Sequence, residues 1–180
     1  MEKTLKQDRV NLVKIVLFGP ESTGKTTLSK LLARHYNTVW VPEYAREYIG
    51  RLKRPYRYDD LLEIAKGQIS LENSTLEKAN EVMFCDTDLY VIKVWSEHKF
   101  GHSDPWILNE IHNRSYDLRL LTYIDIPWEE DPQREHPGMR KYFYDVYFKE
   151  LERDAVKFEE IRGLNQDRLD AAIHAVKKIL

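Results

Sequence analysis

Residues 15–32 read IVLFGPESTGKTTLSKLL, an apolar run that breaks at Gly19 and resumes as a helical pattern from Lys25. Within it, GPESTGKT (residues 19–26) matches the phosphate-binding pattern G-x-x-x-x-G-K-[ST] at every fixed position. Its glycines let the backbone turn and approach an anion without a Cβ in the way. The amides of such a loop point inward, and the dipole of the following helix favours negative charge at the same place. The stretch therefore predicts a strand, a phosphate-binding loop and a helix.

The loop also carries side chains suited to a nucleoside triphosphate. Lys25 is expected to reach the β- and γ-phosphates as a mobile point charge, and Thr26 to place its hydroxyl on the accompanying Mg²⁺. The other predicted ATP contacts in this stretch are Gly19, Glu21, Ser22, Thr23, Gly24 and Thr27. The alternative is a turn with accidental glycines and a solvated lysine. It is disfavoured because the full pattern lies between a strand and a helix.

The composition is that of an ordinary globular enzyme. The 180 residues suffice for one well-buried domain and are few for two. The net charge is −2, so no positive field predicts a nucleic-acid or membrane partner, and the apolar run at residues 12–18 is too short to span a bilayer. The single cysteine, Cys85, forms no disulfide within the chain, which fits a reducing, cytoplasmic location. The oligomeric state is left open.

Strand and helix patterns alternate along the chain. Apolar runs predict strands at residues 13–18, 39–41, 82–85, 118–124 and 156–161. Helical periodicity predicts helices at 25–36, 44–49, 59–80, 89–99, 106–112, 141–152 and 167–180, with Asp59 or Asp60 capping the longest. Such alternation is typical of a parallel sheet with helices on both faces. We therefore predict an α/β protein of the P-loop NTPase fold with about five parallel strands. Its domain spans residues 12–180, after a flexible N-terminus at 1–11.

Carboxylates follow a second predicted strand. The stretch VMFCDTDLY (residues 82–90) is apolar until Asp86 and Asp88. Ligands of parallel sheets bind at the carboxyl ends of the strands, and a carboxylate there holds Mg²⁺ in phosphate-loop enzymes. Asp86 is the better metal candidate because it directly follows four apolar residues. Asp88 is expected either to face the acceptor or to cap the next helix.

Motif spacing favours a kinase over a guanine-nucleotide switch. A switch would carry D-x-x-G and N-K-x-D, and neither occurs in the sequence. A kinase needs a group that orients or deprotonates the acceptor hydroxyl, and VWVPEYAREYIG (residues 39–50) offers Glu43 directly after a strand. Arg46 falls one turn later on the same helix face.

A polar segment after the fourth strand carries two arginines. WEEDPQREHPGMRKYF (residues 128–143) contains Arg134 and Arg140. Cations on a loop that closes over the γ-phosphate neutralise transition-state charge and exclude water. We therefore expect a lid over about residues 129–140, the alternative being a solvated charged loop. Arg140, at a helix start, is the better anchored, but the pattern does not choose between the two.

In order and spacing, GPESTGKTTL, PEYARE, FCDTDLY and the arginine-bearing segment resemble the ribosylnicotinamide kinase domain of the NadR family, a P-loop nucleoside-kinase group. The resemblance implies transfer of the γ-phosphoryl group of ATP, with Mg²⁺, to the 5′-hydroxyl of nicotinamide riboside, giving nicotinamide mononucleotide for NAD salvage. It implies Lys25 on the phosphates and Thr26 and Asp86 on the metal. Either Glu43 or Asp88 would then be the base at the ribose.

The same resemblance suggests which residues contact the acceptor nucleoside and which contact the adenine of ATP. The candidate acceptor contacts are Glu43, Tyr44, Arg46, Gln68, Asp88 and Trp95. Gln68 is included because the family's long helix faces the acceptor base, with a surface amide as the alternative, and Arg168 is a candidate for stacking on adenine. Where the family pattern has a tryptophan before the glutamate, this chain has Pro42. The rings left to stack on nicotinamide are Trp40, Tyr44, Tyr48 and Trp95.

Two other functions remain open from the sequence. One is a kinase for another nucleoside or nucleotide. The other is a regulatory P-loop ATPase without a small-molecule acceptor. In the kinase cases the expected partners are ATP and a small acceptor. The breadth of acceptors and any feedback by NAD are not predicted.

Overall fold

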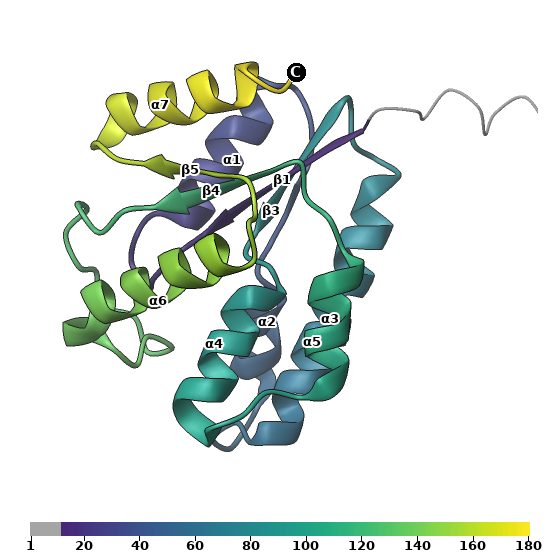
Figure 1. The fold of residues 1–180 in the computed structure, drawn as a ribbon, viewed down its shortest axis with the longest axis vertical. Coiled ribbons are helices and arrows are strands. Elements are labelled where there is room, and N and C mark those ends of the chain that lie inside the picture. Colours follow the sequence, from purple (N-terminus) through teal and green to yellow (C-terminus); the bar gives the residue numbers. More distant parts are fainter. Residues whose placement is uncertain (1–11) are drawn as a thin grey trace, which may run out of the picture.

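A five-stranded parallel sheet forms the centre of the protein in the computed structural model, which describes residues 12–180 (Figure 1). Its strands are β1 (Val13–Phe18), β2 (Trp40–Val41), β3 (Val82–Asp86), β4 (Leu118–Thr122) and β5 (Phe158–Ile161). Their order is β2-β3-β1-β4-β5, and every neighbouring pair is parallel. The predicted fold class is thus confirmed, while the flexible segment expected at residues 1–11 lies outside the described residues.

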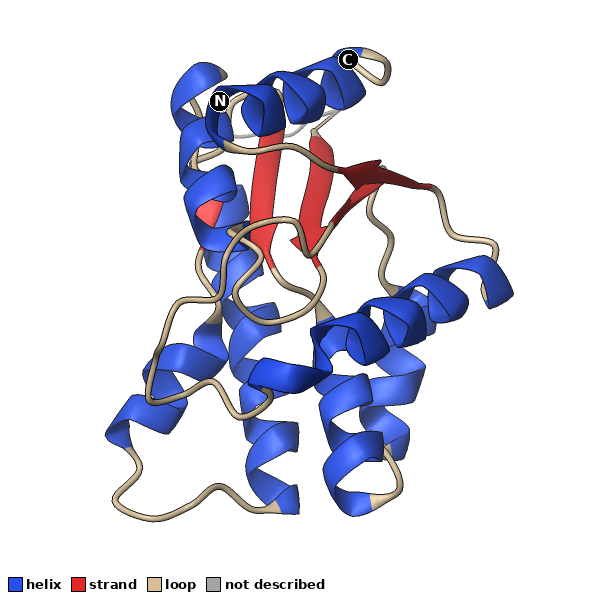
Figure 2. Cartoon of the chain, turned by 90° about the vertical axis from the view of Figure 1, so that its left-hand side faces the viewer, coloured by secondary structure: helices blue, strands red, loops and turns tan. Residues whose placement is uncertain are grey.

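Helices cover both faces of the sheet, and several extend beyond it, as Figure 2 shows. They are α1 (Lys25–His35), α2 (Tyr44–Arg51), α3 (Tyr58–Leu76), α4 (Leu89–Phe100), α5 (Pro105–Asn113), α6 (Arg140–Arg153) and α7 (Asn165–Lys177), with a 3-10 turn η1 (Pro137–Met139). The long helix was predicted to reach Asn80 but ends at Leu76, and Asn80 instead donates its side-chain N–H to the Asn37 carbonyl at 2.7 Å. Within residues 12–180, no helix combines the length and apolarity needed to cross a bilayer.

The central strand is buried on both sides because its side chains alternate between two apolar clusters. Ile15 and Leu17 pack with residues of α1 and α7, whereas Val16 and Phe18 pack with residues of α4 and α6. All four are fully buried, and the ring of Phe18 meets Tyr147 edge-on at 5.2 Å between centroids. Burying such a side chain stabilises the fold by about 1.5–3 kcal/mol. The strand before the glycine-rich loop is therefore firmly anchored.

Outside the sheet, α2, α3, α4 and α5 form a helical layer with its own core (Figure 1). The buried members of this core are Ala45, Leu61, Ile64, Ala65, Leu89, Ile92 and Ile107. The layer matters for the site because α2 directly follows β2. The packing of α2 against α3 therefore decides where the first residues after β2 point.

The strand order brings the loops after β1, β2 and β3 to one edge of the sheet. β1 lies between β3 and β4, and the chain leaves it to form α1 and then β2 on the far side of β3. Ligands of open parallel sheets bind where neighbouring connections diverge in this way. Gly19, Glu43 and Asp86 follow or end β1, β2 and β3 at this edge.

A buried carboxylate fixes the start of α3. Asp60 accepts the backbone N–H of Arg57 at 2.7 Å and the guanidinium of Arg54 at 2.7 and 2.9 Å. The Tyr48 hydroxyl also donates to it, at 3.0 Å. The sequence suggested Asp59 or Asp60 as the N-cap, but the N-cap is Arg57 and Asp60 is the third helical residue of a capping box. The Arg54 guanidinium, followed by the other two donors, holds the pKa of the Asp60 carboxyl well below its usual range.

We expect Asp60→Asn to lower the free energy of unfolding by about 2 kcal/mol at pH 7, since it weakens hydrogen bonds to a charged partner. The folded-state pKa is depressed, so the carboxylate's contribution is present above the unfolded-state pKa and is lost as the pH falls through the folded-state value. The penalty should therefore stay constant from pH 7 to about pH 5 and shrink below about pH 4. Urea unfolding across this range measures it. Asp59→Asn, at an exposed neighbour, is the matched control, and a penalty independent of pH would contradict the argument.

Candidate active site

The loop between β1 and α1 passes close to β4 and leaves the start of α1 open. A Cβ on Gly19, whose φ is 141°, would lie 2.8 Å from the Thr122 hydroxyl oxygen, so only glycine fits there. Gly24 is the N-cap of α1, with φ 75° and no side chain to accept the first helical N–H groups. These amides are therefore available to an anion. Thr23, predicted to contact ATP, lines the cavity at this loop, and its hydroxyl shares a 2.7 Å hydrogen bond with that of Thr122, which ties the loop to β4.

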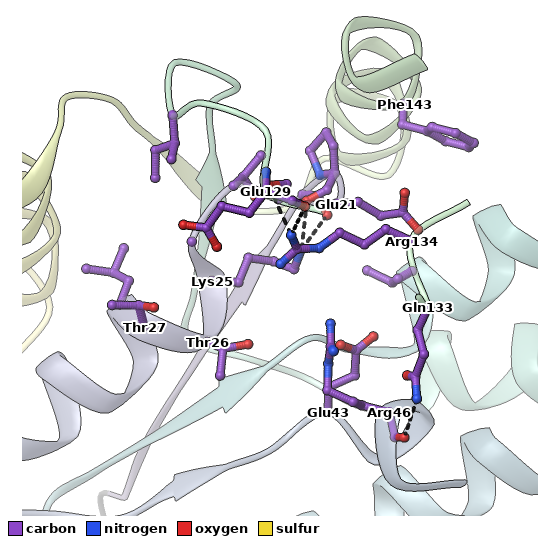
Figure 3. A pocket seen from close by; sticks show the side chains of 18 of the residues that line it. Glu21, Lys25, Thr26, Thr27, Glu43, Arg46, Glu129, Gln133, Arg134 and Phe143 are labelled. Carbon is purple, nitrogen blue, oxygen red and sulfur yellow. Dashed lines mark hydrogen bonds between the residues drawn. The ribbon is translucent and has the colours of Figure 1, made fainter. Parts of the chain in front are cut away.

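A cavity of about 570 Å³ opens at this loop (Figure 3). Lys25 lies in it, and its ammonium donates to the carbonyls of Gly19 at 3.1 Å and Pro20 at 2.7 Å. Burial lowers the pKa of Lys25, and the negative charges of Glu43 and Asp86 act in the opposite direction. The lysine is thus held at the loop mouth among carboxylates, where a phosphate would compete for it.

Thr26 and Asp86 form the pair predicted to hold a metal ion. The Thr26 hydroxyl donates to one carboxylate oxygen of Asp86 at 2.5 Å. The other carboxylate oxygen is buried and has no hydrogen-bond partner among residues 12–180. Burial raises the pKa of Asp86, while the charge of Lys25 and the hydrogen bond from Thr26 lower it. An unpartnered carboxylate oxygen beside a hydroxyl is a set of hard oxygen ligands that fits Mg²⁺.

Glu43 enters the same cavity from the end of β2. It is the N-cap residue of α2, yet its side chain makes no capping hydrogen bond. Figure 3 shows Thr26, Lys25 and Glu43 around a common space. Burial and the charge of Asp86 raise the pKa of Glu43, and the charges of Lys25 and Arg46 lower it. A carboxyl group with a raised pKa in a cavity is suited to accept a proton.

Asp88 does not line the cavity, and its prediction as the catalytic base or acceptor contact is corrected. Its carboxylate accepts the N–H of Tyr90 at 3.0 Å as the N-cap of α4 and lies 3.3 Å from the Nε of Arg119. Thr87, between the two aspartates, has φ 84°, a strained value for a β-branched residue. This turn separates the surroundings of Asp86 from those of Asp88. Of the two roles expected for Asp88, the structure shows the one as N-cap of α4.

Gln68 and Tyr44 are also absent from the cavity wall, contrary to their predicted contact with the acceptor base. The side-chain oxygen of Gln68 accepts the N–H of Tyr44 at 2.8 Å, and its nitrogen donates to the Pro42 carbonyl at 3.4 Å. The ring of Tyr44 lies against α3 at Gly67. The two other predicted acceptor contacts, Arg46 and Trp95, do line the cavity, as does Thr27 at its opposite side.

Arg168 borders the cavity, but its guanidinium serves as a tether rather than as a stacking surface for adenine. It donates to the carboxylate of Asp125 at 2.7 Å and to the carbonyl of Gly163 at 3.0 Å. It also donates to the carbonyls of Thr23 and Tyr123, both at 2.9 Å. Arg168 is only 4% exposed, and it joins the turn after β5 to the loop and to the segment after β4. The predicted stacking role is therefore corrected.

Both predicted arginines reach the glycine-rich loop. Arg140 donates to the carbonyls of Ser22 at 3.2 Å and Ile126 at 2.7 Å. Arg134 donates to the Ser22 hydroxyl at 3.4 Å and to the carbonyl of Glu129. Each guanidinium lies 5.8 Å from the centre of the Trp128 ring, within the range of a cation–π contact. Two positive charges are thereby held beside the loop, and of the two arginines Arg134 lines the cavity whereas Arg140 does not.

Side chains of the loop bind the backbone of residues 129–140, the segment predicted as a lid. Glu21 accepts the N–H groups of Glu135 at 3.2 Å and His136 at 3.1 Å, and the Ser22 hydroxyl accepts that of Glu129 at 2.9 Å. Glu21 and Ser22 were predicted as ATP contacts, and both line the cavity. Their attachment to the segment was missed because no local pattern pairs residues more than 100 positions apart.

A second connection joins this segment to α2. Arg46 forms an ion pair with Asp131 at 2.7 Å, and its carbonyl accepts the side-chain N–H of Gln133 at 3.2 Å. Asp131 and Gln133 were not singled out in the sequence, since nothing in a polar loop shows which residue will meet a distant helix. The segment thus closes the cavity from two sides, at the loop and at α2.

A phosphate-binding loop at the centre of a parallel sheet, a hydroxyl–carboxylate pair and two arginines at the loop mouth define a kinase-like P-loop domain. A family model described as an AAA domain matches residues 14–168. The chain belongs to this family, and it is a P-loop kinase domain of the NadR type.

Curated relatives and solved structures agree with this family. The "Trifunctional NAD biosynthesis/regulator protein NadR" of Salmonella typhimurium is 27% identical in an alignment of 173 residues that covers 92% of this chain and 42% of the relative. The protein of the same name from Escherichia coli is 28% identical over 159 residues, 85% of this chain and 39% of the relative. The chain thus spans about two fifths of these curated relatives.

A solved NadR protein in complex with NR has a TM-score of 0.79 and 27% identity, covering 93% of this chain and 49% of that one. A NadR protein with NAD and AMP-PNP has a TM-score of 0.76 and 25% identity, with the same coverage. Thymidylate kinase from Ehrlichia chaffeensis, at a TM-score of 0.61 and 15% identity over 94% of this chain and 100% of that one, shares the fold.

We expect Glu21→Ala to speed hydrogen exchange at the amides of Glu135 and His136 by about 10- to 100-fold. The variant removes the charged acceptor of both N–H groups, and bonds of this kind contribute about 1.5–3 kcal/mol. Exchange followed by mass spectrometry or NMR measures it. The control is Asp145→Ala, which breaks an exposed ion pair with Lys141 on α6. Unaltered rates at both amides in Glu21→Ala would contradict the predicted clamp.

Proposed function

We propose that the protein transfers the γ-phosphoryl group of ATP to the 5′-hydroxyl of nicotinamide riboside. The observation that carries the proposal is that one cavity is lined both by Lys25, at the phosphate-binding loop, and by the carboxylate of Glu43, which enters from the end of β2 (Figure 3). A donor and an acceptor can therefore lie side by side in it. The NadR protein solved with NR, 27% identical to this chain, supports the choice of acceptor.

The donor end comprises the loop amides, Lys25 and the start of α7. The triphosphate would bind at the N-terminus of α1, and Lys25 would exchange the carbonyls of Gly19 and Pro20 for phosphate oxygens. The cavity wall beyond the loop is formed by Thr27, Leu31, Asn165, Gln166 and Leu169, a mixture of apolar and amide groups suited to a purine base. Thr26 and Asp86 would hold Mg²⁺, which when bound neutralises charge on the phosphate oxygens.

The acceptor end is lined by aromatic side chains and by carboxylates. Trp95, Phe143 and Tyr147 line the cavity from α4 and α6, and the carboxylates Glu21 and Glu43 also line it. Flat rings stack on a nucleoside base, and the π face of an aromatic ring attracts a cation. A pyridinium ring, planar and positively charged, suits both features. Trp95 would thus supply the stacking ring that the family pattern places at the position of Pro42.

In the proposed reaction, Glu43 accepts the proton of the ribose 5′-hydroxyl while the oxygen of that hydroxyl bonds to the γ-phosphorus. The bond from that phosphorus to the bridging oxygen breaks, and ADP leaves. Lys25, Arg134 and Arg140 stabilise the charge on the phosphoryl oxygens, and the segment over residues 129–140 keeps water out. The raised pKa of Glu43 brings it nearer to the operating pH, where a general base is most effective.

We expect purified protein with ATP and Mg²⁺ to convert nicotinamide riboside to nicotinamide mononucleotide in preference to adenosine, guanosine, cytidine and thymidine. Mass spectrometry of the products measures this. Lys25→Ala, purified in parallel, controls for contaminating kinases and should be at least about 10³-fold slower, because positioning and charge account for most of this catalysis.

The alternatives give different products. Vigorous phosphorylation of another nucleoside without nicotinamide mononucleotide would show a kinase of different specificity. Hydrolysis of ATP that no nucleoside alters would indicate a regulatory ATPase.

We expect Glu43→Gln to lower kcat by about 10²–10⁴-fold, the usual contribution of a general base. The KM for ATP should change little, because Glu43 lies at the acceptor end. Steady-state kinetics measure both constants. Glu47→Gln is the matched control, since Glu47 lies on the outside of the same helix in an exposed pair with Arg51. Near-normal turnover of Glu43→Gln would remove Glu43 from the mechanism.

A further inference from the structure

We propose that Gly67 and Gln68 of α3 are positioning residues that aim Glu43 into the cavity. The inference rests on the proposed role of Glu43 as the general base. The contacts from which it is argued do not depend on which reaction the protein catalyses. Gln68 is 1% exposed, and its two side-chain hydrogen bonds reach the residues on either side of Glu43, the Tyr44 N–H at 2.8 Å and the Pro42 carbonyl at 3.4 Å. A single amide thereby holds the backbone before and after the carboxylate.

Gln68 satisfies one of the N–H groups that the start of a helix leaves without an intrahelical partner. The first N–H groups of a helix lack intrahelical partners and are commonly satisfied by the side chain of the N-cap. In α2 the N-cap is Glu43, and it makes no such bond. Instead, the first N–H of the helix, that of Tyr44, donates to Gln68 from another helix. The Glu43 carboxylate is not engaged in capping and lines the cavity, while Gln68 holds the backbone beside it.

Gly67 completes the attachment by letting the Tyr44 ring lie directly on α3. A Cβ at residue 67 would lie 2.0 Å from one ring carbon and 2.4 and 2.5 Å from two others. Glycine within a helix costs about 1 kcal/mol relative to alanine, so its presence here needs a local reason. The ring contact supplies it. Tyr44 is thus fixed twice, through its ring at Gly67 and through its N–H at Gln68.

The helix that holds the turn is itself firmly placed. Leu61, Ile64 and Ala65 of α3 are at most 1% exposed and belong to the core shared by α2, α3, α4 and α5. A rigid support matters because a displacement of about 1 Å at a reacting group can cost about 10²-fold in rate. Glutamine also suits the position chemically, because its amide offers a donor and an acceptor together, whereas leucine of similar size offers neither.

The first test is Gln68→Leu, with kinetics on whichever nucleoside the wild-type protein phosphorylates fastest. We expect kcat to fall by about 10–100-fold with the KM for ATP unchanged, because Glu43 loses its orientation while the donor end is untouched. The same substitution in a Glu43→Gln background should produce no further fall. An equal fall in both backgrounds would show a general structural role and overturn the proposal.

Hydrogen exchange tests the attachment without turnover. The Tyr44 amide should exchange about 10-fold faster or more in Gln68→Leu, since its acceptor is gone. Ser96→Ala is the matched control, because it removes another buried side-chain bond to a carbonyl, that from Ser96 to His102 at 2.6 Å. It should leave both kcat and the Tyr44 amide within about twofold of wild type.

The two measurements separate this inference from the proposed function. If no nucleoside is phosphorylated, the proposed function fails, and exchange at Tyr44 alone decides the attachment. Faster exchange in Gln68→Leu but not in Ser96→Ala supports the attachment. Unchanged exchange in Gln68→Leu overturns it, whichever acceptor the protein uses.

Discussion

The open N-terminus of α1 is the feature on which the rest of the site depends. Because Gly24 supplies no capping side chain, the first amides of the helix need an external acceptor, and the helix dipole makes an anion the favoured one. Lys25 and Thr26 occupy the first turn, so their positions are fixed by the same helix. The loop before that helix follows a strand whose side chains are buried on both faces of the sheet. The anion site is therefore anchored to the core of the protein.

The glycine-rich loop has two faces with different partners. Its amides and Lys25 face the cavity, whereas the side chains of Glu21 and Ser22 bind the backbone of residues 129–140. Hydrogen bonds of this type contribute only about 1–3 kcal/mol each, which is strong enough to order a segment and weak enough to let it open for substrate exchange. Because one loop serves both faces, a shift of the loop on binding phosphate would be felt directly by the segment that covers it.

Features that depend on neighbouring residues could be predicted from the sequence, and those that depend on distant partners could not. The bounds of β1 and the start of α1 follow from one contiguous stretch, and the place of Asp86 follows from the strand before it. The sequence did not decide whether Asp88 contacts the acceptor or caps a helix. Its role depends on the unusual backbone of Thr87 and on Arg119, 31 residues away. Arg168 was misassigned since its partner Thr23 is 145 residues away. The burial of Arg168 could not be seen in the polar first turns of the predicted helix.

A proline at position 42 is understandable from the way this turn is held. Proline fixes its own φ and has no N–H to satisfy, and its carbonyl is bound by Gln68. The orientation of Glu43 therefore needs no aromatic anchor beside it in the sequence. Aromatic surface is supplied instead by α4 and α6, through Trp95, Phe143 and Tyr147. Under the proposed function, holding the carboxylate and stacking the base would be tasks of separate elements, so the aromatic wall could change without moving the carboxylate.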